Sequence, residues 1–403
     1  MRHHFYLVVF VLFFAFLQAN SQIVKILFDA TKAETAGNAD WVISNSDSPQ
    51  QIPSPAQSGI TSTTSETYWN GGISAWGVDC VKKGYYVETL PASGKITYGT
   101  SSNLQDLSKY QVFVVCEPNS QFSATEKTAI INFVKNGGGL FMVSDHDVSD
   151  RNSDGWDSPH IWNDLLTTNT VEANPFGISF DYVNISLTST NLATITNDPI
   201  LHGTMGSCAK LMWSNGTTMT LDKTKNPTAV GYVFNTGVST TGSTGVMFAT
   251  AKYGSGKVAA IGDSSPCDDG TGGSGNTLYN GYTGDVGVNH QNILMNATIW
   301  LATKSSGTGT GISELNSDKS DLKIFPNPTE NAKLNIQFNN EKPTSAAFKI
   351  VDLTGKELVN STFQTGLGIQ NKTIDIKALK NGIYILKLST SQGNTSKQFV
   401  VSN

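Results

Sequence analysis

Residues 112–143 constrain the fold more than any other part of the sequence. They begin with a short, continuously apolar run, Val112–Cys116, typical of a strand that is buried on both faces. Ser123 and Glu126 then form a capping box, and apolar side chains follow at helical spacing, so a helix is expected. Three glycines end this helix, and a second apolar run follows at Leu140–Val143. Strand, helix and strand in this order predict a βαβ unit and therefore a parallel sheet.

Further apolar runs and a last helix extend this pattern through residues 22–303. The runs are Ile23–Phe28, Tyr85–Leu90, Gly245–Thr250 and Val258–Ile261, and the helix begins near Asn289. Glycines between the last two runs predict a hairpin turn. We therefore expect an α/β domain with a doubly wound, mostly parallel sheet. Residues 169–244 are rich in Thr and Asn, and their pattern leaves the strand order open.

The N-terminus has the pattern of a cleavable signal peptide over residues 1–21. A short basic start precedes an apolar run of 13 residues, Phe5–Leu17, and small residues follow at Ala19 and Ser21. The alternative, an uncleaved membrane anchor, needs a run of roughly 20 residues. The sequence therefore predicts export and no transmembrane segment in the mature protein. A net charge of -5 without a Lys/Arg cluster argues against nucleic acid as a partner.

Cysteines are few, but their number is even, as in many exported proteins. The four are Cys80, Cys116, Cys208 and Cys267. They permit two disulfides in three connectivities, and the sequence does not choose among these. Cys116 lies in an apolar strand pattern, so a buried free thiol is the alternative there.

The composition changes after residue 303. Residues 304–321 form a Gly-, Thr- and Ser-rich segment that has little to bury and predicts a linker. Residues 322–403 alternate β-branched and polar residues between turns at Asn327-Pro328 and Asn381-Gly382. This pattern predicts a small C-terminal all-β sandwich.

The tail carries four short motifs in a fixed order. They are Phe325–Thr329, Asp352–Lys356, Gly382–Lys387 and Lys397–Val401. With these motifs the tail resembles the type A sorting domain of type IX secretion cargo from Bacteroidota. The resemblance implies the type IX secretion machinery as a partner, and a location that is secreted or on the outer cell surface. An ordinary adhesive β-sandwich is the alternative.

The large domain resembles a divergent class I glutamine amidotransferase-like domain of the flavodoxin-like sort. The resemblance rests on Ser123–Val143, on Asp198–Gly203, and on Tyr253–Asp263 followed by a helix. That family places a nucleophilic Cys on a turn after the strand that corresponds to Leu140–Val143. This chain instead has Ser144-Asp145-His146 there, so we do not expect glutamine hydrolysis.

Acidic residues follow several of the predicted strands. Because ligands bind at the carboxyl ends of strands in such sheets, we expect these residues to converge on one site. The candidate catalytic residues are Asp145, His146, Asp263 and His290, acting as acid–base groups or ligands. Asp29 and Asp147 are candidate metal ligands. Helix caps and turns are the alternative role for each Asp.

Two loops add further candidate metal ligands. Asp150, Asn152 and Asp154 with Gly155 match the start of a calcium-binding loop, although Ile161 replaces the bidentate Glu. Asp268 and Asp269 lie in a second acidic, Gly-rich loop. The predicted cofactor is calcium or another divalent cation. The alternative is a pair of solvated turn loops.

Two functions follow from these features. The first is a metal-assisted hydrolase that acts on an extracellular substrate, a glycan or a phosphoester. The second is a non-catalytic, calcium-stabilised surface module that binds a glycan or a protein. Tryptophans near the predicted strand ends suit sugar rings, but they serve equally well as loop anchors. The sequence does not choose between these functions.

Overall fold

The computed structural model describes residues 23–35, 40–43, 55–195, 198–273, 278–303, 322–329, 332–340, 343–352, 356–390 and 393–402. The predicted signal peptide and linker lie outside these ranges. The chain divides into two compact units, Met1–Gly309 and Thr310–Asn403, and each is described by itself. Among the described helices, none combines the length and the apolar character that crossing a membrane requires.

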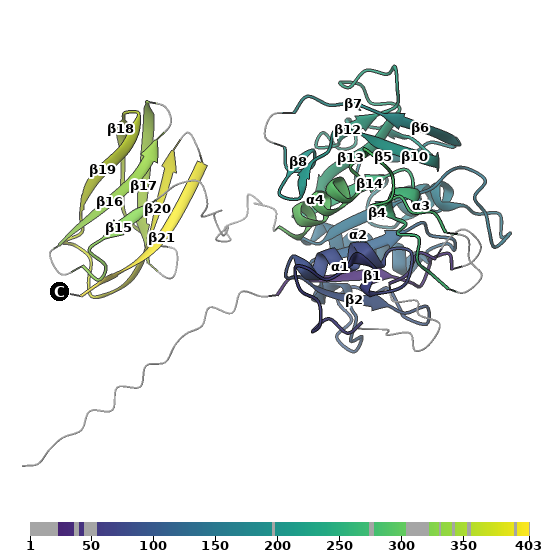
Figure 1. The fold of residues 1–403 in the computed structure, drawn as a ribbon. Coiled ribbons are helices and arrows are strands. Elements are labelled where there is room, and N and C mark those ends of the chain that lie inside the picture. Colours follow the sequence, from purple (N-terminus) through teal and green to yellow (C-terminus); the bar gives the residue numbers. More distant parts are fainter. Residues whose placement is uncertain are drawn as a thin grey trace, which may run out of the picture. The chain divides into compact units, whose positions relative to one another are not determined.

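The large unit is built on one ten-stranded sheet, of which one half is parallel (Figure 1). In spatial order this half contains β2 (Tyr86–Leu90), β1 (Lys25–Asp29), β3 (Val112–Cys116), β4 (Gly139–Val143) and β14 (Gly256–Ile261). All four neighbouring pairs run parallel. The strand order reverses between β1 and β3, which is where ligands bind in open α/β sheets.

The other half of the sheet is antiparallel. It contains β13 (Val246–Tyr253), β11 (Met219–Leu221) and β5 (Ile178–Phe180), with β12 (Val230–Phe234) and β7 (Asn191–Leu192) branching from β13. The predicted hairpin joins β13 to β14, and a tight hairpin makes its two strands antiparallel. The sheet is therefore mixed, and the expectation of a mostly parallel sheet holds only for its first half.

Residues 169–244, whose strand order the sequence left open, supply short strands. Besides β5, β7, β11 and β12 they form two small antiparallel pairs outside the large sheet. The pairs are β6 (Ile185–Ser189) with β10 (Leu211–Gly216), and β8 (His202–Gly203) with β9 (Gly206–Ser207). Three 3-10 helices lie in connections: η1 (Glu66–Tyr68), η2 (Leu107–Lys109) and η3 (Ser265–Cys267).

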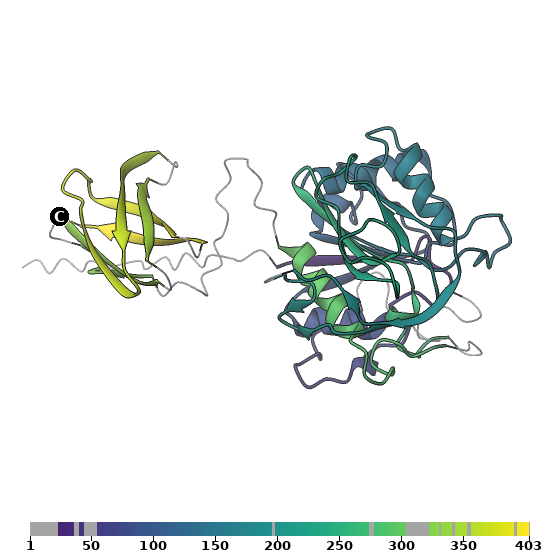
Figure 2. The same cartoon turned by 90° about the horizontal axis from the view of Figure 1, so that it is seen from above.

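Helices cover both faces of the large sheet (Figure 2). The helices α1 (Ser74–Lys82) and α4 (His290–Ala302) bury their apolar side chains in one core. The helices α2 (Ala124–Lys135) and α3 (Ser158–Thr168) do so in a second core on the opposite face. Trp76 in α1 is fully buried and packs edge-on against aromatic rings of β1 and β4.

The predicted βαβ unit is present as β3, α2 and β4. Both hydrogen bonds of its capping box form: Ser123 Oγ accepts from the Glu126 N–H, and Glu126 Oε2 accepts from the Ser123 N–H. Such a cap stabilises a helix by about 1 kcal/mol. The cap thus fixes the start of α2.

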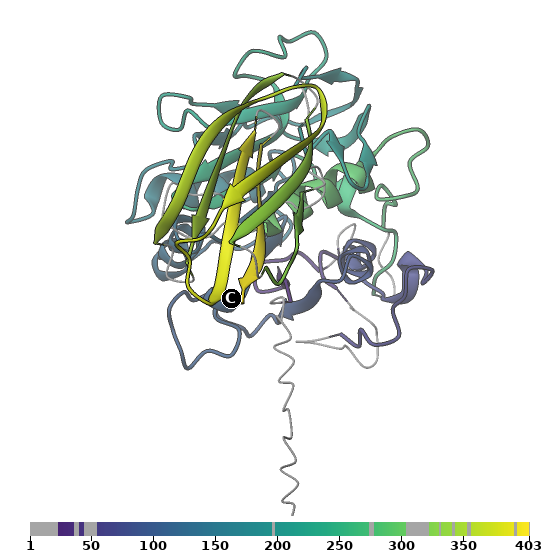
Figure 3. The same cartoon turned by 90° about the vertical axis from the view of Figure 1, so that its left-hand side faces the viewer.

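The second unit is all-β and holds its own apolar core (Figure 3). One antiparallel sheet has the order β15 (Lys323–Phe325), β16 (Lys333–Asn340) and β19 (Gly368–Asp375). The other has the order β18 (Glu357–Thr365), β17 (Thr344–Val351), β20 (Gly382–Thr390) and β21 (Gly393–Val401). The prediction of an all-β C-terminal unit is confirmed.

Candidate functional site

Three parallel strands end on the same edge and bring polar side chains together. Cys116 of β3 is in register with Val143 of β4, and Val143 is in register with Ile261 of β14. The residues that follow these strands therefore line up, and they include Glu117, Asp145 and Ser264. These three side chains line a pocket of about 280 Å³. That volume is at the small end for ligand sites in proteins.

A row of three buried carboxyl groups lies at the site, and two of them line the pocket. Glu34, Glu117 and Asp145 are each at most 4 % exposed. The charge of Glu117 acts on Glu34, and the charge of Asp145 acts on Glu117. Like charges at close range oppose each other's ionisation. Each acid of the row therefore makes ionisation of its neighbour less favourable.

Burial changes the acidity of this row. Burial, together with the charge of Glu117, raises the pKa of Glu34 to about 8. Burial raises the pKa of Glu117 well above its ordinary value, and the charge of Asp145 raises it further. The pKa of Asp145 is also strongly raised by burial and by the charge of Asp263. These acids hold protons at a pH where exposed carboxyl groups have lost them.

The row has few hydrogen-bond donors of its own. In the described part of the chain, no N–H or O–H group donates to either oxygen of Glu34 or to Glu117 Oε1. Ser264 Oγ donates to Glu117 Oε2 at 2.7 Å. Arg151 Nε lies 3.5 Å from Glu34 Oε1 and supplies the nearby positive charge. Three buried acids facing one arginine make an acidic site.

His146 lies at the rim of the pocket, as its position after β4 predicts. Its Nδ1 is 2.9 Å from Asp145 Oδ2 and 3.1 Å from the backbone oxygen of Asn215. Because the Asn215 backbone oxygen can only accept, Nδ1 carries the hydrogen in this contact. Asp145 thus orients the imidazole, and the two predicted catalytic residues form a contact pair.

Asp263 and His290 lie outside the pocket lining. Asp263 uses both oxygens as acceptors for backbone N–H groups, from Ser214 and Ser265. Burial raises its pKa to about 7. His290 is buried at the start of α4, where Nδ1 contacts the Gly281 oxygen and Nε2 accepts from the Met212 N–H. Burial lowers the pKa of His290. Both side chains hold loops around the site, and the structure does not bring them to its centre.

Three of the predicted metal ligands accept hydrogen bonds from backbone N–H groups. Asp29 accepts from Thr31 and Lys32, as a turn former does. Asp269 Oδ2 accepts from the Ala75 N–H at the start of α1. Asp268 lines the pocket, but both of its oxygens also accept backbone hydrogen bonds. Burial raises the pKa of Asp268 to about 7, and that of Asp29 and Asp269 to about 6.

The calcium-like loop folds into local turns. Asp150 accepts from the N–H groups of Asp154 and Gly155, Asn152 accepts from Asp154, and Asp154 accepts from Trp156. These are hydrogen bonds within the loop, as in the alternative that the sequence left open. The metal-binding role of Asp150, Asn152 and Asp154 stays a prediction.

Asp147 belongs to a different group. One ligand atom each from Asp147, Asp157 and His160 lies within 4.8 Å of the others, and this is the one such group among the described residues. His160 Nδ1 is 2.6 Å from Asp157 Oδ1 and 3.7 Å from Asp147 Oδ1. The His160 ring also stacks on Tyr182 at 3.9 Å. This group holds one of the predicted metal ligands.

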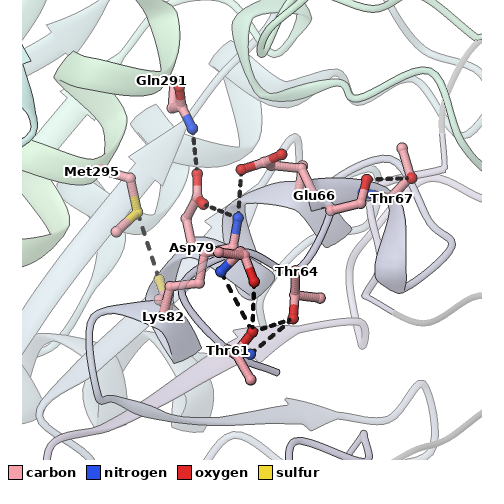
Figure 4. Close-up of polar contacts among 12 residues, drawn as sticks. Thr61, Thr64, Glu66, Thr67, Asp79, Lys82, Gln291 and Met295 are labelled. Carbon is pink, nitrogen blue, oxygen red and sulfur yellow. Dashed lines mark hydrogen bonds and ion pairs between the residues drawn. The ribbon is translucent and has the colours of Figure 1, made fainter. Parts of the chain in front are cut away.

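A second buried polar cluster ties α1 to its surroundings (Figure 4). Asp79 Oδ2 accepts from Tyr282 Oη at 2.8 Å and from Gln291 Nε2 at 2.6 Å. Lys82 Nζ is 3.5 Å from Asp79 Oδ1 and 2.5 Å from Glu66 Oε1. These partners come from α1, α4, η1 and the loop before α4, so the cluster joins segments that are distant in sequence. All four cysteines of the chain are buried and free.

Sequence reasoning missed part of the site. Glu34 and Arg151 lie in loops, where no periodicity marks a buried or functional side chain. Glu117 and Ser264 were visible as polar residues after strands. No sequence signal distinguished them from cap residues. The contact between β3 and the loop after β14 joins residues that are 147 positions apart.

The tail matches a known family. Residues 323–402 match the family of the secretion system C-terminal sorting domain. This confirms the predicted sorting domain. The protein is therefore exported, to the cell surface or as a secreted protein, and its tail interacts with the type IX secretion machinery. No curated protein matches the chain.

Several solved structures are similar to parts of the chain. The mmIFT52 N-terminal domain shares 14% identity with a TM-score of 0.42, over 71% of this chain and 99% of that one. CopC from Methylosinus trichosporium OB3b shares 21% identity with this chain, with a TM-score of 0.18. The match covers 21% of this chain and 93% of that one. A mutant β-glucosidase from Listeria innocua shares 9% identity with this chain, with a TM-score of 0.16. The match covers 96% of this chain and 47% of that one. These scores are too low to assign a fold or a function.

Proposed function

We propose that the large unit is an exported hydrolase whose pocket performs acid–base chemistry on an extracellular glycan substrate. One observation carries this proposal. Glu117 and Asp145 lie buried and in contact at the ends of adjacent parallel strands, on the wall of a pocket. Partly exposed side chains of His146 and Arg151 surround them, so a ligand can reach the site. Buried acids with raised pKa values beside a pocket are typical of functional sites.

The raised pKa values of these acids suit proton transfer. A carboxyl group that retains its proton near neutral pH can act as a general acid, and its ionised partner can act as the base. Glu117 and Asp145 supply such a pair because ionisation of one opposes ionisation of the other. His146, which Asp145 orients, extends the pair toward solvent.

The pocket fits a neutral sugar better than a phosphoester. A phosphoester would bring negative charge against three acids, with Arg151 as the balancing cation. Trp41 and Tyr279 line the same pocket and offer apolar rings, which suit sugar faces.

The predicted divalent cation also remains part of the proposal, at the group of Asp147, Asp157 and His160. Two carboxylates and an imidazole suit zinc or manganese better than calcium, which prefers six to eight oxygens. Bound there, the cation would supply positive charge beside the pocket. The three side chains would hold it, and the acid–base groups would stay Glu117 and Asp145.

The finer fold assignment, a doubly wound glutamine amidotransferase-like domain, is likewise proposed. The strand order β2-β1-β3-β4-β14 agrees with the flavodoxin-like order. Helices from both cores flank this half of the sheet. Ser144 stands where the amidotransferase nucleophile would be expected, which agrees with a changed chemistry.

A substrate panel tests the function. Purified protein is assayed on chromogenic glycosides, acylated sugars, other carboxylic esters and phosphoesters. We expect turnover of a sugar substrate that Glu117→Gln reduces at least ~100-fold, as loss of a general acid–base group does. Glu172→Gln, which changes an exposed Glu, is the matched control and should retain wild-type rates. Absence of turnover on the whole panel, with glycan binding retained, would favour the non-catalytic binding module.

A further inference from the structure

Ser264 makes an unusual contact for a residue that begins a 3-10 helix. It precedes η3, but its side chain makes no capping hydrogen bond. Its hydroxyl instead donates to Glu117 Oε2 at 2.7 Å. The serine is 2 % exposed and lines the pocket. When Glu117 is ionised, the Ser264 hydroxyl therefore directs its proton at a base.

Neighbouring serines differ from Ser264 in this respect. Ser144 Oγ donates to the backbone oxygen of Asp145, and Ser265 Oγ donates to the backbone oxygen of Ser214. A backbone carbonyl cannot remove a proton from a hydroxyl at ordinary pH. Among these three serines, Ser264 alone is paired with a carboxyl group that lines the pocket, because the Asp263 carboxyl beside Ser265 lies outside the lining.

Glu117 is held in place from two sides. Its side chain contacts Asp145, and its N–H donates to the Val143 oxygen at 3.0 Å. Its φ is 39°, in the left-handed region that a non-glycine residue seldom adopts. Backbone conformations of this kind are strained and cluster at functional sites. The fold therefore keeps Glu117 in one orientation toward Ser264.

We propose that Ser264, Glu117 and Asp145 act as nucleophile, base and orienting acid, and that the pocket cleaves a carboxylic ester carried by a glycan. This inference rests on the proposed function and names its bond and its nucleophile. The arrangement follows the general logic of an activated serine, in which a base takes the proton and a third group orients the base.

The chemistry balances without a further reagent. Ser264 Oγ attacks the carbonyl carbon while its proton passes to Glu117. The bond between that carbon and the sugar oxygen then breaks, and Glu117 returns the proton to the leaving sugar hydroxyl. Water next attacks the acyl-serine and gives a proton to Glu117, which passes it to Ser264 as the carboxylic acid leaves. Asn215 and Arg151 line the same pocket and carry N–H groups for the carbonyl oxygen.

A covalent probe tests the nucleophile without knowledge of the natural substrate. A fluorophosphonate forms a bond from phosphorus to an activated serine oxygen and releases fluoride. We expect one label per protein, at Ser264 by peptide mass spectrometry. Ser264→Ala should abolish it, and Glu117→Gln should slow labelling at least ~10-fold. Ser265→Ala and the surface change Glu172→Gln should keep it.

Each outcome decides the inference. Absence of label, a label elsewhere, or labelling of Glu117→Gln at the wild-type rate would overturn it. Turnover that survives Ser264→Ala but not Asp145→Asn would also overturn it and would leave the proposed acid–base hydrolase standing. Because Ser264→Ala can fail to fold, Ser264→Cys is examined with it by circular dichroism. A folded Ser264→Cys that forms no adduct with the thiol reagent iodoacetamide argues against a reachable nucleophile.

Discussion

Glu34→Gln should stabilise the large unit near neutral pH, although it replaces a buried residue. Both carboxyl oxygens of Glu34 lack a donor among the described residues, and Glu117 faces them. Gln is nearly the same size, cannot ionise, and can donate to Glu117 Oε1. The substitution therefore removes a group that must stay protonated in the folded state.

The magnitude follows from the pKa of Glu34, which burial and Glu117 raise from 4.5 to about 8. The folded state binds this proton more tightly than the unfolded chain, so its stabilising effect is complete below pH 4.5 and is lost as the pH rises to 8. At pH 7 the difference corresponds to about 3 kcal/mol. Because the pocket is accessible to water, screening lowers this to about 1–3 kcal/mol.

Urea unfolding followed by tryptophan fluorescence measures this effect. We expect Glu34→Gln to raise the free energy of unfolding relative to wild type at pH 7.5 and to change it little at pH 4.5. Glu172→Gln controls for the loss of one carboxylate at the surface. The reasoning is refuted if the stabilities of wild type and Glu34→Gln run parallel across this pH range.

Three further predictions concern other parts of the chain. Chelation by EDTA should lower the Tm of wild-type protein in differential scanning fluorimetry and leave the Tm of Asp147→Asn unchanged. Equal shifts in the two proteins would exclude a cation at the group of Asp147, Asp157 and His160. Gly256→Ala should lower the free energy of unfolding by about 1–3 kcal/mol, because its Cβ would clash with the backbone oxygens of Val134 and Gly138. A Gly256→Ala variant that unfolds at the same denaturant concentration as wild type would contradict this prediction. Deletion of residues 322–403 should retain the protein inside the cell, as judged by fractionation, whereas export of the truncated chain would show a second signal.

The parts of the fold that depend on local sequence were predictable. The capping box fixed the start of α2, and glycines marked the hairpin between β13 and β14. The motifs of the tail identified the sorting domain before any structural information. Each of these patterns lies within a few consecutive residues. It can therefore be recognised without knowing which distant segments pack together.

Contacts between distant segments were not predictable in the same way. The antiparallel half of the sheet pairs short strands such as β11 and β5, whose patterns are too brief to set an order. Asp263 accepts from the Ser214 N–H, 49 positions away, and no local pattern in the sequence indicates this contact. The catalytic role of Asp263 stays a prediction. His290 lies at a helix start, but burial of that start depends on Gly281 and Met212.

At the site, the sequence predicted the location of some residues and missed others. Asp145 and His146 follow β4 directly, and parallel strands end on a common edge. Their position in the sequence therefore predicted their place at the pocket. Their roles stay predictions. Glu34 reaches the row from a loop, and its burial follows from packing that no residue pattern encodes.

One comparison tests the account most directly: kcat/KM of wild-type protein and of Asp145→Asn on the best sugar substrate of the panel. The account predicts a loss of at least ~100-fold with an unchanged circular dichroism spectrum, since Asp145 contacts both Glu117 and His146. Asp222→Asn, whose carboxylate bonds only within its own turn, should match wild type. Equal kcat/KM values for wild type and Asp145→Asn would contradict the claim that this acid row performs the chemistry.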